Sequence, residues 1–124
     1  METPQEIEVW YVIPAIRREL AIAMKNNGLK QVEIANLLGI TKSAITQYLN
    51  NKRASKVYFN SKIKSQVIES VKSIQNKLDT MREMQRILHL ARNENVICDV
   101  HVKLDKDFEN CHVCYEDNLI TIKR

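Results

Sequence analysis

A glycine between two short apolar-periodic segments is the feature that most limits what this chain can fold into. Residues 29–53 read LKQVEIANLLGITKSAITQYLNNKR. Gly39 supplies the positive φ that often ends a helix, and Thr41 is a favourable N-cap for the next one. The small side chain of Ala35 allows two helices to cross closely, and Ile45 follows at a suitable spacing. The segment therefore predicts two short helices joined by a tight turn.

The apolar residues of this segment have helical spacing. Those expected to be buried are Val32, Ile34, Ala35, Leu37 and Leu38 in the first helix, and Ile45 and Leu49 in the second. A helical hairpin of an ordinary bundle is one interpretation. It does not explain why the second helix is so polar on its outer face.

This pattern resembles the XRE-type, or lambda-repressor-like, helix-turn-helix family of transcription regulators. The matching positions are Gln31, Glu33, Ile34, Ala35, Leu38, Gly39, Ile40, Thr41, Ile45 and the run 49–53. The resemblance covers roughly a third of the chain, and it implies that the helix opened by Thr41 enters the major groove of double-stranded DNA. An interaction module that uses the same fold for protein contacts is the alternative. That alternative predicts little basic surface around Thr41 and weak salt dependence.

The outer face of the second helix carries the candidate base-reading residues. The side chains expected to point outward are Lys42, Ser43, Ala44, Thr46 and Gln47. Gln47 can pair with adenine, Lys42 can donate to guanine or a phosphate, and Ala44 can meet a thymine methyl group. Ser43, Ala44 and Gln47 correspond to base-contacting positions in the resembled family. A solvated helix face is the ordinary alternative for each of them.

Phosphate contacts are expected around the two ends of this segment. Gln31 begins the first helix, where free backbone N–H groups favour an anion. Basic residues flank the same side, namely Lys30, Lys52, Arg53 and Lys56. Each lysine has solubility as an alternative role, and Tyr48 fits either the core or a phosphate contact.

The remaining chain is also expected to be mainly helical before its last part. Thr3, Pro4 and Glu6 fit a capped helix start, and Pro14 either kinks that helix or starts another. Residues 14–27 place Ile16, Leu20, Ala23 and Met24 on one face, with Arg17, Arg18, Glu19 and Lys25 outward. Residues 61–91 form one helix or two, because Asn76 and Asp79 interrupt the pattern and Thr80 is a possible cap.

A heptad-like stripe in residues 61–91 suggests a homodimer. Its members are Val67, Val71, Ile74, Leu78, Met81 and Leu88. One reading helix contacts few base pairs, so regulators of this kind commonly bind two half-sites as two-fold dimers. The alternative is that the stripe packs onto the chain's own helix-turn-helix. A short span cannot separate these interpretations.

The cysteine-bearing tail has metal-ligand spacing. Cys98 and His101 are followed by Cys111 and Cys114, so each pair is separated by two residues. Zinc suits such ligands, and an iron–sulfur cluster is the alternative cofactor. The tail resembles a small archaeal group of helix-turn-helix regulators with cysteine-rich ends, although His101 stands where a further cysteine is expected. Reduced thiols with structural or redox roles, or a disulfide, are the other possibilities.

A strand is predicted at the start of this tail, which conflicts with the metal hypothesis. Val96, Cys98, Val100, Val102 and Leu104 alternate, and residues 119–122 are a candidate partner strand. Residues three apart on a strand face opposite ways, so Cys98 and His101 would not share a metal there. His112 would then be a substitute ligand, or no metal would bind.

The composition agrees with a DNA-binding protein of modest size. The chain has 124 residues, a formal net charge of +4 and three cysteines. No apolar run reaches the ~20 residues of a membrane span, and the acidic start does not resemble a signal peptide, so a cytoplasmic location is expected. No acid–base pair, nucleotide-binding glycine loop or nucleophile motif indicates an enzyme.

Together these patterns predict a mainly α protein in three parts. Residues 1–56 form a helix-turn-helix DNA-binding domain, residues 57–92 a helical dimerisation region, and residues 93–124 a small β or metal-binding tail. The predicted function is a sequence-specific transcription regulator, with recognition helix 41–50 and a possible metal or redox response through its cysteines.

Overall fold

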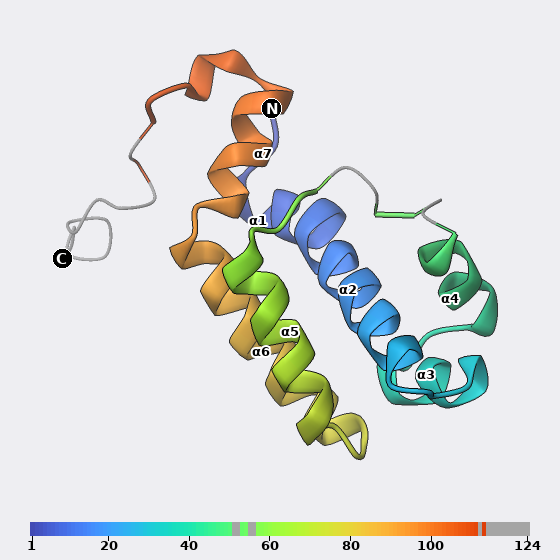
Figure 1. Ribbon diagram of the computed structural model, residues 1–124. Helices are drawn as coiled ribbons and strands as arrows, with labels where there is room; N and C mark the ends of the chain where they lie inside the picture. The colour runs from blue at the N-terminus through green and yellow to red at the C-terminus, as the bar shows by residue number, and fades with distance from the viewer. Residues whose placement is uncertain (51–52, 55–56, 112, 114–124) are drawn as a thin grey trace, which may run out of the picture.

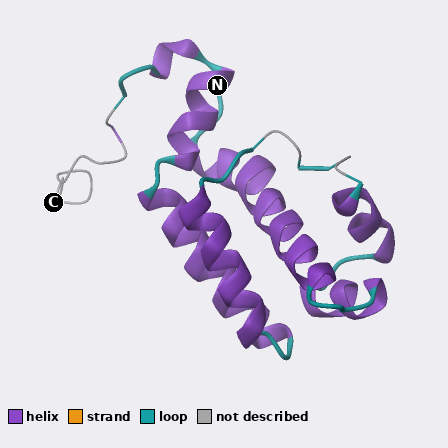
Figure 2. Ribbon diagram, in the orientation of Figure 1, coloured by secondary structure: helices purple, strands orange, loops and turns teal. Residues whose placement is uncertain are grey.

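The part of the chain that the structure describes folds mainly into helices. The computed structural model describes residues 1–50, 53–54, 57–111 and 113 (Figure 1). In chain order the elements are α1 (Pro4–Ile7), η1 (Glu8–Val12), α2 (Ile13–Asn26), α3 (Gln31–Leu38), α4 (Lys42–Leu49), α5 (Ser61–Ser73), α6 (Lys77–Asn93), α7 (Val96–Leu104) and η2 (Lys106–Phe108). The described part of the chain contains no strand, so the prediction of a mainly α protein is confirmed (Figure 2). None of the helices described is long and apolar enough to cross a membrane.

The first three elements form one continuous helical segment with a wide turn in it. The capping box is confirmed, because Glu6 N–H donates to Thr3 Oγ1 at 3.2 Å and Thr3 N–H donates to Glu6 Oε1 at 2.8 Å. Residues Glu8–Val12 then form a π-helical turn, in which Ile13 N–H reaches back to Glu8 O. Pro14 follows directly. A proline ring clashes with the carbonyl four residues earlier in a regular α-helix, and the wider turn accommodates it.

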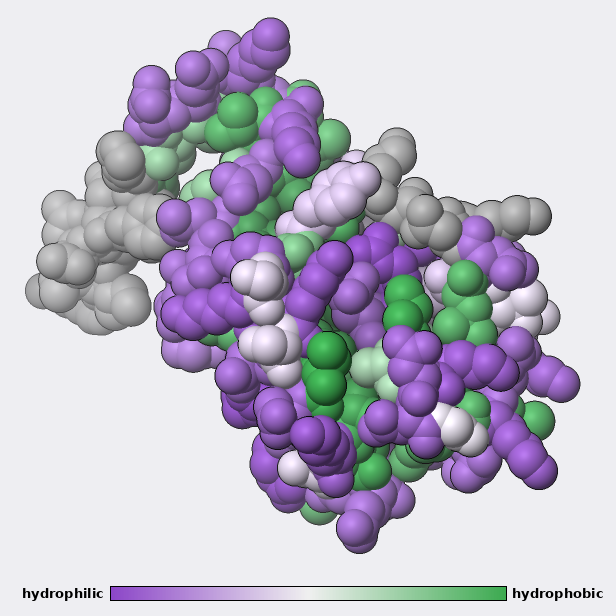
Figure 3. All heavy atoms as spheres, viewed as in Figure 1, coloured by the Kyte–Doolittle hydropathy of each residue, from purple (hydrophilic) through white to green (hydrophobic). Residues whose placement is uncertain are grey.

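Helix α2 is the centre of the molecule, with other helices on several sides of it. It packs against α3, α4, α5 and α6. Its apolar residues join one core that runs from Ile7 to Val100 and so includes all three predicted parts of the chain. The pair α3–α4 lies at one edge and α7 at the opposite edge (Figure 1). On the visible face, hydrophobic side chains gather between the α5–α6 hairpin and α2, with hydrophilic ones around them (Figure 3).

Residues 61–91 form two helices, not one. Helix α5 ends at Ser73, and Asn76 caps α6 by accepting a hydrogen bond from Asp79 N–H at 2.9 Å. The carboxylate of Asp79 also accepts from Gln75 N–H at 3.0 Å and pairs with Arg82, and these contacts lower the pKa of Asp79. The N-cap of the second helix is therefore Asn76, one turn before the predicted Thr80.

Most of the heptad-like stripe packs inside this chain. Val67, Val71, Ile74 and Leu88 are buried in the core, whereas Leu78 and Met81 are 68% and 58% exposed. The α5–α6 hairpin also packs against α2, and α6 against α3. The predicted seam is thus largely used for packing onto the chain's own helix-turn-helix.

The strand predicted from Val96 to Leu104 is wrong, because these residues form helix α7. The apolar residues of this stretch fit both a period of two and a helical face. In the structure the buried face comprises Val96, Ile97, Val100 and His101, which is a helical spacing. This face packs on α1 and α6, and such tertiary contacts override a weak local preference. The predicted partner strand at 119–122 lies outside the described residues.

Candidate nucleic-acid interface

The turn that joins α3 to α4 is built as the sequence predicts. Gly39 adopts the left-handed conformation, with φ of 67°, and the N–H of Ile40 reaches back to Ala35 O at 3.1 Å. Thr41 caps α4 by accepting a hydrogen bond from Ala44 N–H at 3.1 Å. Ile45 is fully buried against the core. These local contacts set the angle at which α4 leaves α3 and hold it on α2.

The outer face of α4 carries four of the five predicted reading residues. Lys42, Ser43, Thr46 and Gln47 are all exposed. The outward placement of Ala44 is wrong, because it is only 5% exposed and packs inward with its neighbour Ile45. On a helix of eight residues the buried face is Ala44, Ile45 and Tyr48. That face is wider than the predicted pair of Ile45 and Leu49.

The first helix of the pair also differs from the prediction at one position. Val32 is 63% exposed, although burial was expected. Ile34, Ala35 and Leu38 are buried as predicted, with Leu37 at the core's edge. Val32 lies in the first turn of α3, on the side of the helix away from its buried residues. Its apolar character therefore says little about which way it faces.

A hydrogen bond joins the start of α3 to the outer face of α4. Thr46 Oγ1 donates to Gln31 Oε1 at 3.2 Å, and it lies 3.1 Å from Lys42 O. Gln31 is the first residue of α3, where unpaired backbone N–H groups favour anions. Lys30 is exposed directly before it, and its backbone N–H donates to Glu33 Oε1 at 3.0 Å. The predicted phosphate-binding and base-reading residues thus share one surface.

Tyr48 lies on the buried face of α4, which favours the first of its two predicted roles, packing, over a phosphate contact. Its side chain is nearly fully buried. The guanidinium carbon of Arg53 lies 5.6 Å from the centre of this ring, and Arg53 is itself exposed. A cation over an aromatic face is attracted by the ring quadrupole. Arg53 is therefore held just beyond α4, while the predicted contacts Lys52 and Lys56 lie outside the described residues.

Arg18 is a residue of this site that the sequence reasoning missed. It was expected to face outward, but it is only 7% exposed. Its guanidinium donates to Val57 O at 3.1 Å and to Ala54 O, and it pairs with Glu19 at 2.9 Å. Arg18 therefore ties α2 to the loop that carries Arg53. The spacing of apolar and polar residues along α2 does not predict such a role, because the hydrogen-bond partners are backbone carbonyls 36 and 39 residues away.

The predicted metal ligands that the structure describes lie on and just after α7, at the opposite edge of the fold from this interface (Figure 1). Cys98, His101 and Cys111 line one pocket of about 110 Å³. His101 is buried and stacks on Phe108 with the ring centres 4.0 Å apart, and its Nε2 has no hydrogen-bond partner among the described residues. Within those residues, no three histidine, cysteine or acidic side chains are arranged to hold a metal ion. Cys114 and His112 lie outside the described residues.

Comparison with known proteins bears on the helix-turn-helix alone. No curated protein and no solved structure matches this chain. A family model described as "Helix-turn-helix" matches residues 20–57, which run from α2 through α3 and α4 to Val57. The match does not extend to the cysteine-bearing tail. It supports the resemblance of this part of the chain to an XRE-type helix-turn-helix, a domain that suggests a DNA-binding regulator.

Proposed function

We propose that this protein regulates transcription by reading a specific DNA sequence with α4 in the major groove. The observation that carries the proposal is the shared surface of α3 and α4, joined by the Gln31–Thr46 hydrogen bond. Phosphate contacts fix the position of a reading helix, and its exposed polar side chains then meet base edges. Ser43 and Gln47 are the base-reading residues in this arrangement, and Lys42 and Thr46 support them.

The phosphate contacts come from both sides of α4. Gln31 and Lys30 meet one phosphate at the start of α3, where backbone N–H groups add to the attraction. Arg53 meets the backbone on the other side of α4, held over Tyr48 and on a loop fixed by Arg18. Such contacts raise affinity for any sequence and make it salt-dependent. Ala44, being buried, has no role at the bases in this proposal.

The proposed active form is a homodimer that presents two α4 helices to two half-sites. A single helix-turn-helix reads few base pairs, and two-fold symmetry extends the site. The exposed Leu78 and Met81 are the part of the heptad-like stripe that remains available for a partner. They lie in the first turns of α6, which packs on α3.

The proposal is tested by selecting duplexes from a random pool at fixed salt. The enriched sequences are expected to contain two related half-sites with centres about 10 base pairs apart, or a multiple of that distance. They should bind about 10³-fold more tightly than a scrambled duplex of the same composition. Light scattering of the complex should give two chains per duplex. Equal binding of selected and scrambled duplexes contradicts sequence reading, and weak binding without salt dependence favours the protein-interaction alternative.

The second part of the proposal is a metal ion that brings together Cys98, His101 and Cys111, which line one pocket but are not arranged around an ion in the described part of the chain. On a strand, Cys98 and His101 would face opposite ways and could not share an ion. In helix α7 they lie on one side, because residues three apart on a helix are neighbours on its surface. The unpaired Nε2 of buried His101 and the two thiols supply borderline-soft donors that suit zinc. Cys114 is the proposed fourth ligand. The bound ion would cross-link η2 and the following residues to α7.

Loss of this metal is expected to weaken DNA binding while leaving most of the fold intact. Helix α7 packs on α6, and α6 packs on α3. A change in the position of α7 would therefore shift α6 and, through α6, the helix α3 of the DNA-binding surface. Replacing Cys111 and Cys114 with serine should preserve helical circular dichroism but weaken binding to a two-half-site operator by about fivefold.

Metal analysis of the parent should find zinc, and an absorption band in the visible range would indicate an iron–sulfur cluster instead. The control is His89→Ala, because His89 is exposed on α6 outside the pocket. An unchanged operator affinity for the double variant would remove the tail from the mechanism.

A further inference from the structure

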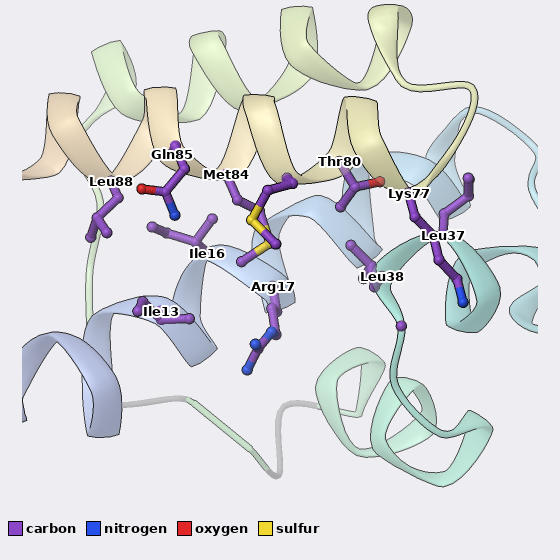
Figure 4. Close-up of a pocket in the computed structure, with 12 residues that line it drawn as sticks. Ile13, Ile16, Arg17, Leu37, Leu38, Lys77, Thr80, Met84, Gln85 and Leu88 are labelled. Carbon is purple, nitrogen blue, oxygen red and sulfur yellow. The ribbon is translucent and has the colours of Figure 1, made fainter.

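A pocket of about 350 Å³ lies between the helix-turn-helix and α6. Its walls come from α2, from the end of α3 and from α6, and they are largely aliphatic or methionine side chains, including Ile16, Leu38 and Met84 (Figure 4). Sites for small molecules typically begin at about 300 Å³, with apolar walls and a few polar groups. The pocket therefore has the size and lining of a small-molecule site.

The polar groups of this pocket are biased toward positive charge. Arg17 and Lys77 line it, and none of the lining residues is acidic. The nearest acidic neighbour of Arg17 in sequence, Glu19, is already paired with Arg18 at 2.9 Å. The charge on Arg17 is thus left without a matching anion in the lining.

One atom of Arg17 lacks a partner although it is out of contact with solvent. Its Nε is buried and makes no hydrogen bond within the described part of the chain. In Figure 4 the Arg17 side chain leaves α2 below Met84, and its guanidinium end points away from α6. A buried donor without an acceptor costs free energy, and an arginine recovers most of that cost by donating two parallel hydrogen bonds to a planar carboxylate.

We propose that this pocket binds a small amphipathic molecule with one anionic group and a short apolar tail. The anionic group accepts hydrogen bonds from the guanidinium of Arg17. The apolar tail lies against Ile16, Leu38 and Met84. The complementary charge selects an anion over a neutral or cationic molecule of the same shape. This site lies outside the DNA-binding surface, and its occupancy does not depend on DNA binding.

Calorimetric titration of the full chain with three probes of equal chain length tests the proposal. The probes are octanoate, 1-octanol and octylamine, at one ionic strength and without DNA. Octanoate is expected to bind at one site per chain and about tenfold more tightly than 1-octanol, since a hydrogen bond to a charged partner contributes more than that to binding. Octylamine should bind more weakly than either. Equal affinities for the three probes, or no saturable binding of octanoate, would overturn the proposal.

Two kinds of variant locate the site. Arg17→Gln should remove the tenfold preference for octanoate and leave 1-octanol unaffected. The matched control Arg82→Gln changes an exposed arginine of α6 outside the lining and should keep the preference. Leu37→Trp should fill the pocket and abolish binding of both probes, with Met84→Phe as a second filling variant if the first lowers helical content. Retention of the preference in Arg17→Gln would overturn the assignment.

A second copy of the chain is the competing occupant of this pocket. Light scattering of the free protein with and without octanoate distinguishes it. If the free chain is dimeric, if Leu37→Trp makes it monomeric, and if octanoate does not bind the parent, the occupant is a second copy and the small-molecule proposal fails. A mass that is unchanged by octanoate, together with saturable octanoate binding, supports the proposal.

Discussion

Arg18→Met is expected to lower the free energy of unfolding by about 3 kcal/mol. Methionine retains much of the buried apolar stem but removes every hydrogen-bond donor of the guanidinium. Val57 O and Ala54 O then lose their partner, and the Glu19 carboxylate loses its counter-ion in a mostly buried position. Leaving a buried charge and two carbonyls unpaired is among the few changes with so large a cost. Urea denaturation followed by circular dichroism measures the difference.

The matched control for this variant is Arg82→Met. Arg82 pairs with Asp79 at 3.0 Å, but its side chain is largely exposed, so its loss should change stability by no more than about 0.5 kcal/mol. Arg18→Lys should recover part of the loss, because a lysine keeps the charge but not the fork of donors. If Arg18→Met is no less stable than Arg82→Met, the contacts from α2 to the loop at Ala54–Val57 do not hold that loop in solution.

Gln47→Ala is expected to weaken binding to the selected operator by about 1–3 kcal/mol, with the loss confined to one base position in each half-site. Gln47 is exposed on the outer face of α4, so its truncation leaves the core unchanged. An amide that pairs with adenine loses both hydrogen bonds when the side chain is removed. Titration against operators changed at one position at a time gives the base preference of parent and variant.

Arg53→Ala is the matched comparison for this variant. Arg53 lies beyond α4 over the ring of Tyr48 and carries a charge suited to the phosphate backbone. Its loss should weaken binding to every duplex alike and lower the salt slope by about one. A uniform loss for Gln47→Ala, or a loss at one base position for Arg53→Ala, would reverse the roles assigned to these two residues.

The sequence by itself determined the helix-turn-helix, because each signal there acts over a few residues. Gly39 accepts the left-handed conformation that ends α3, and Thr41 caps α4 through its own side chain. The burial of Ile34, Leu38 and Ile45 agrees with their helical spacing, although the same spacing misplaced Val32 and Ala44. The exposed face with Lys42, Ser43, Thr46 and Gln47 follows from the same spacing. Local chemistry of this kind does not depend on distant partners.

The tertiary structure alone decided the features whose partners lie far along the chain. Residues 96–104 fit either a strand or a helix, and the surfaces of α1 and α6 selected the helical face. The heptad-like stripe fitted a dimer seam or an internal contact, and packing of the α5–α6 hairpin on α2 buried most of it. Arg18 was predicted to face solvent, but in the structure its guanidinium donates to the carbonyl oxygens of Ala54 and Val57. In each case the residue pattern was compatible with two structures. Contacts between segments far apart in the sequence lowered the free energy of one of them below that of the other.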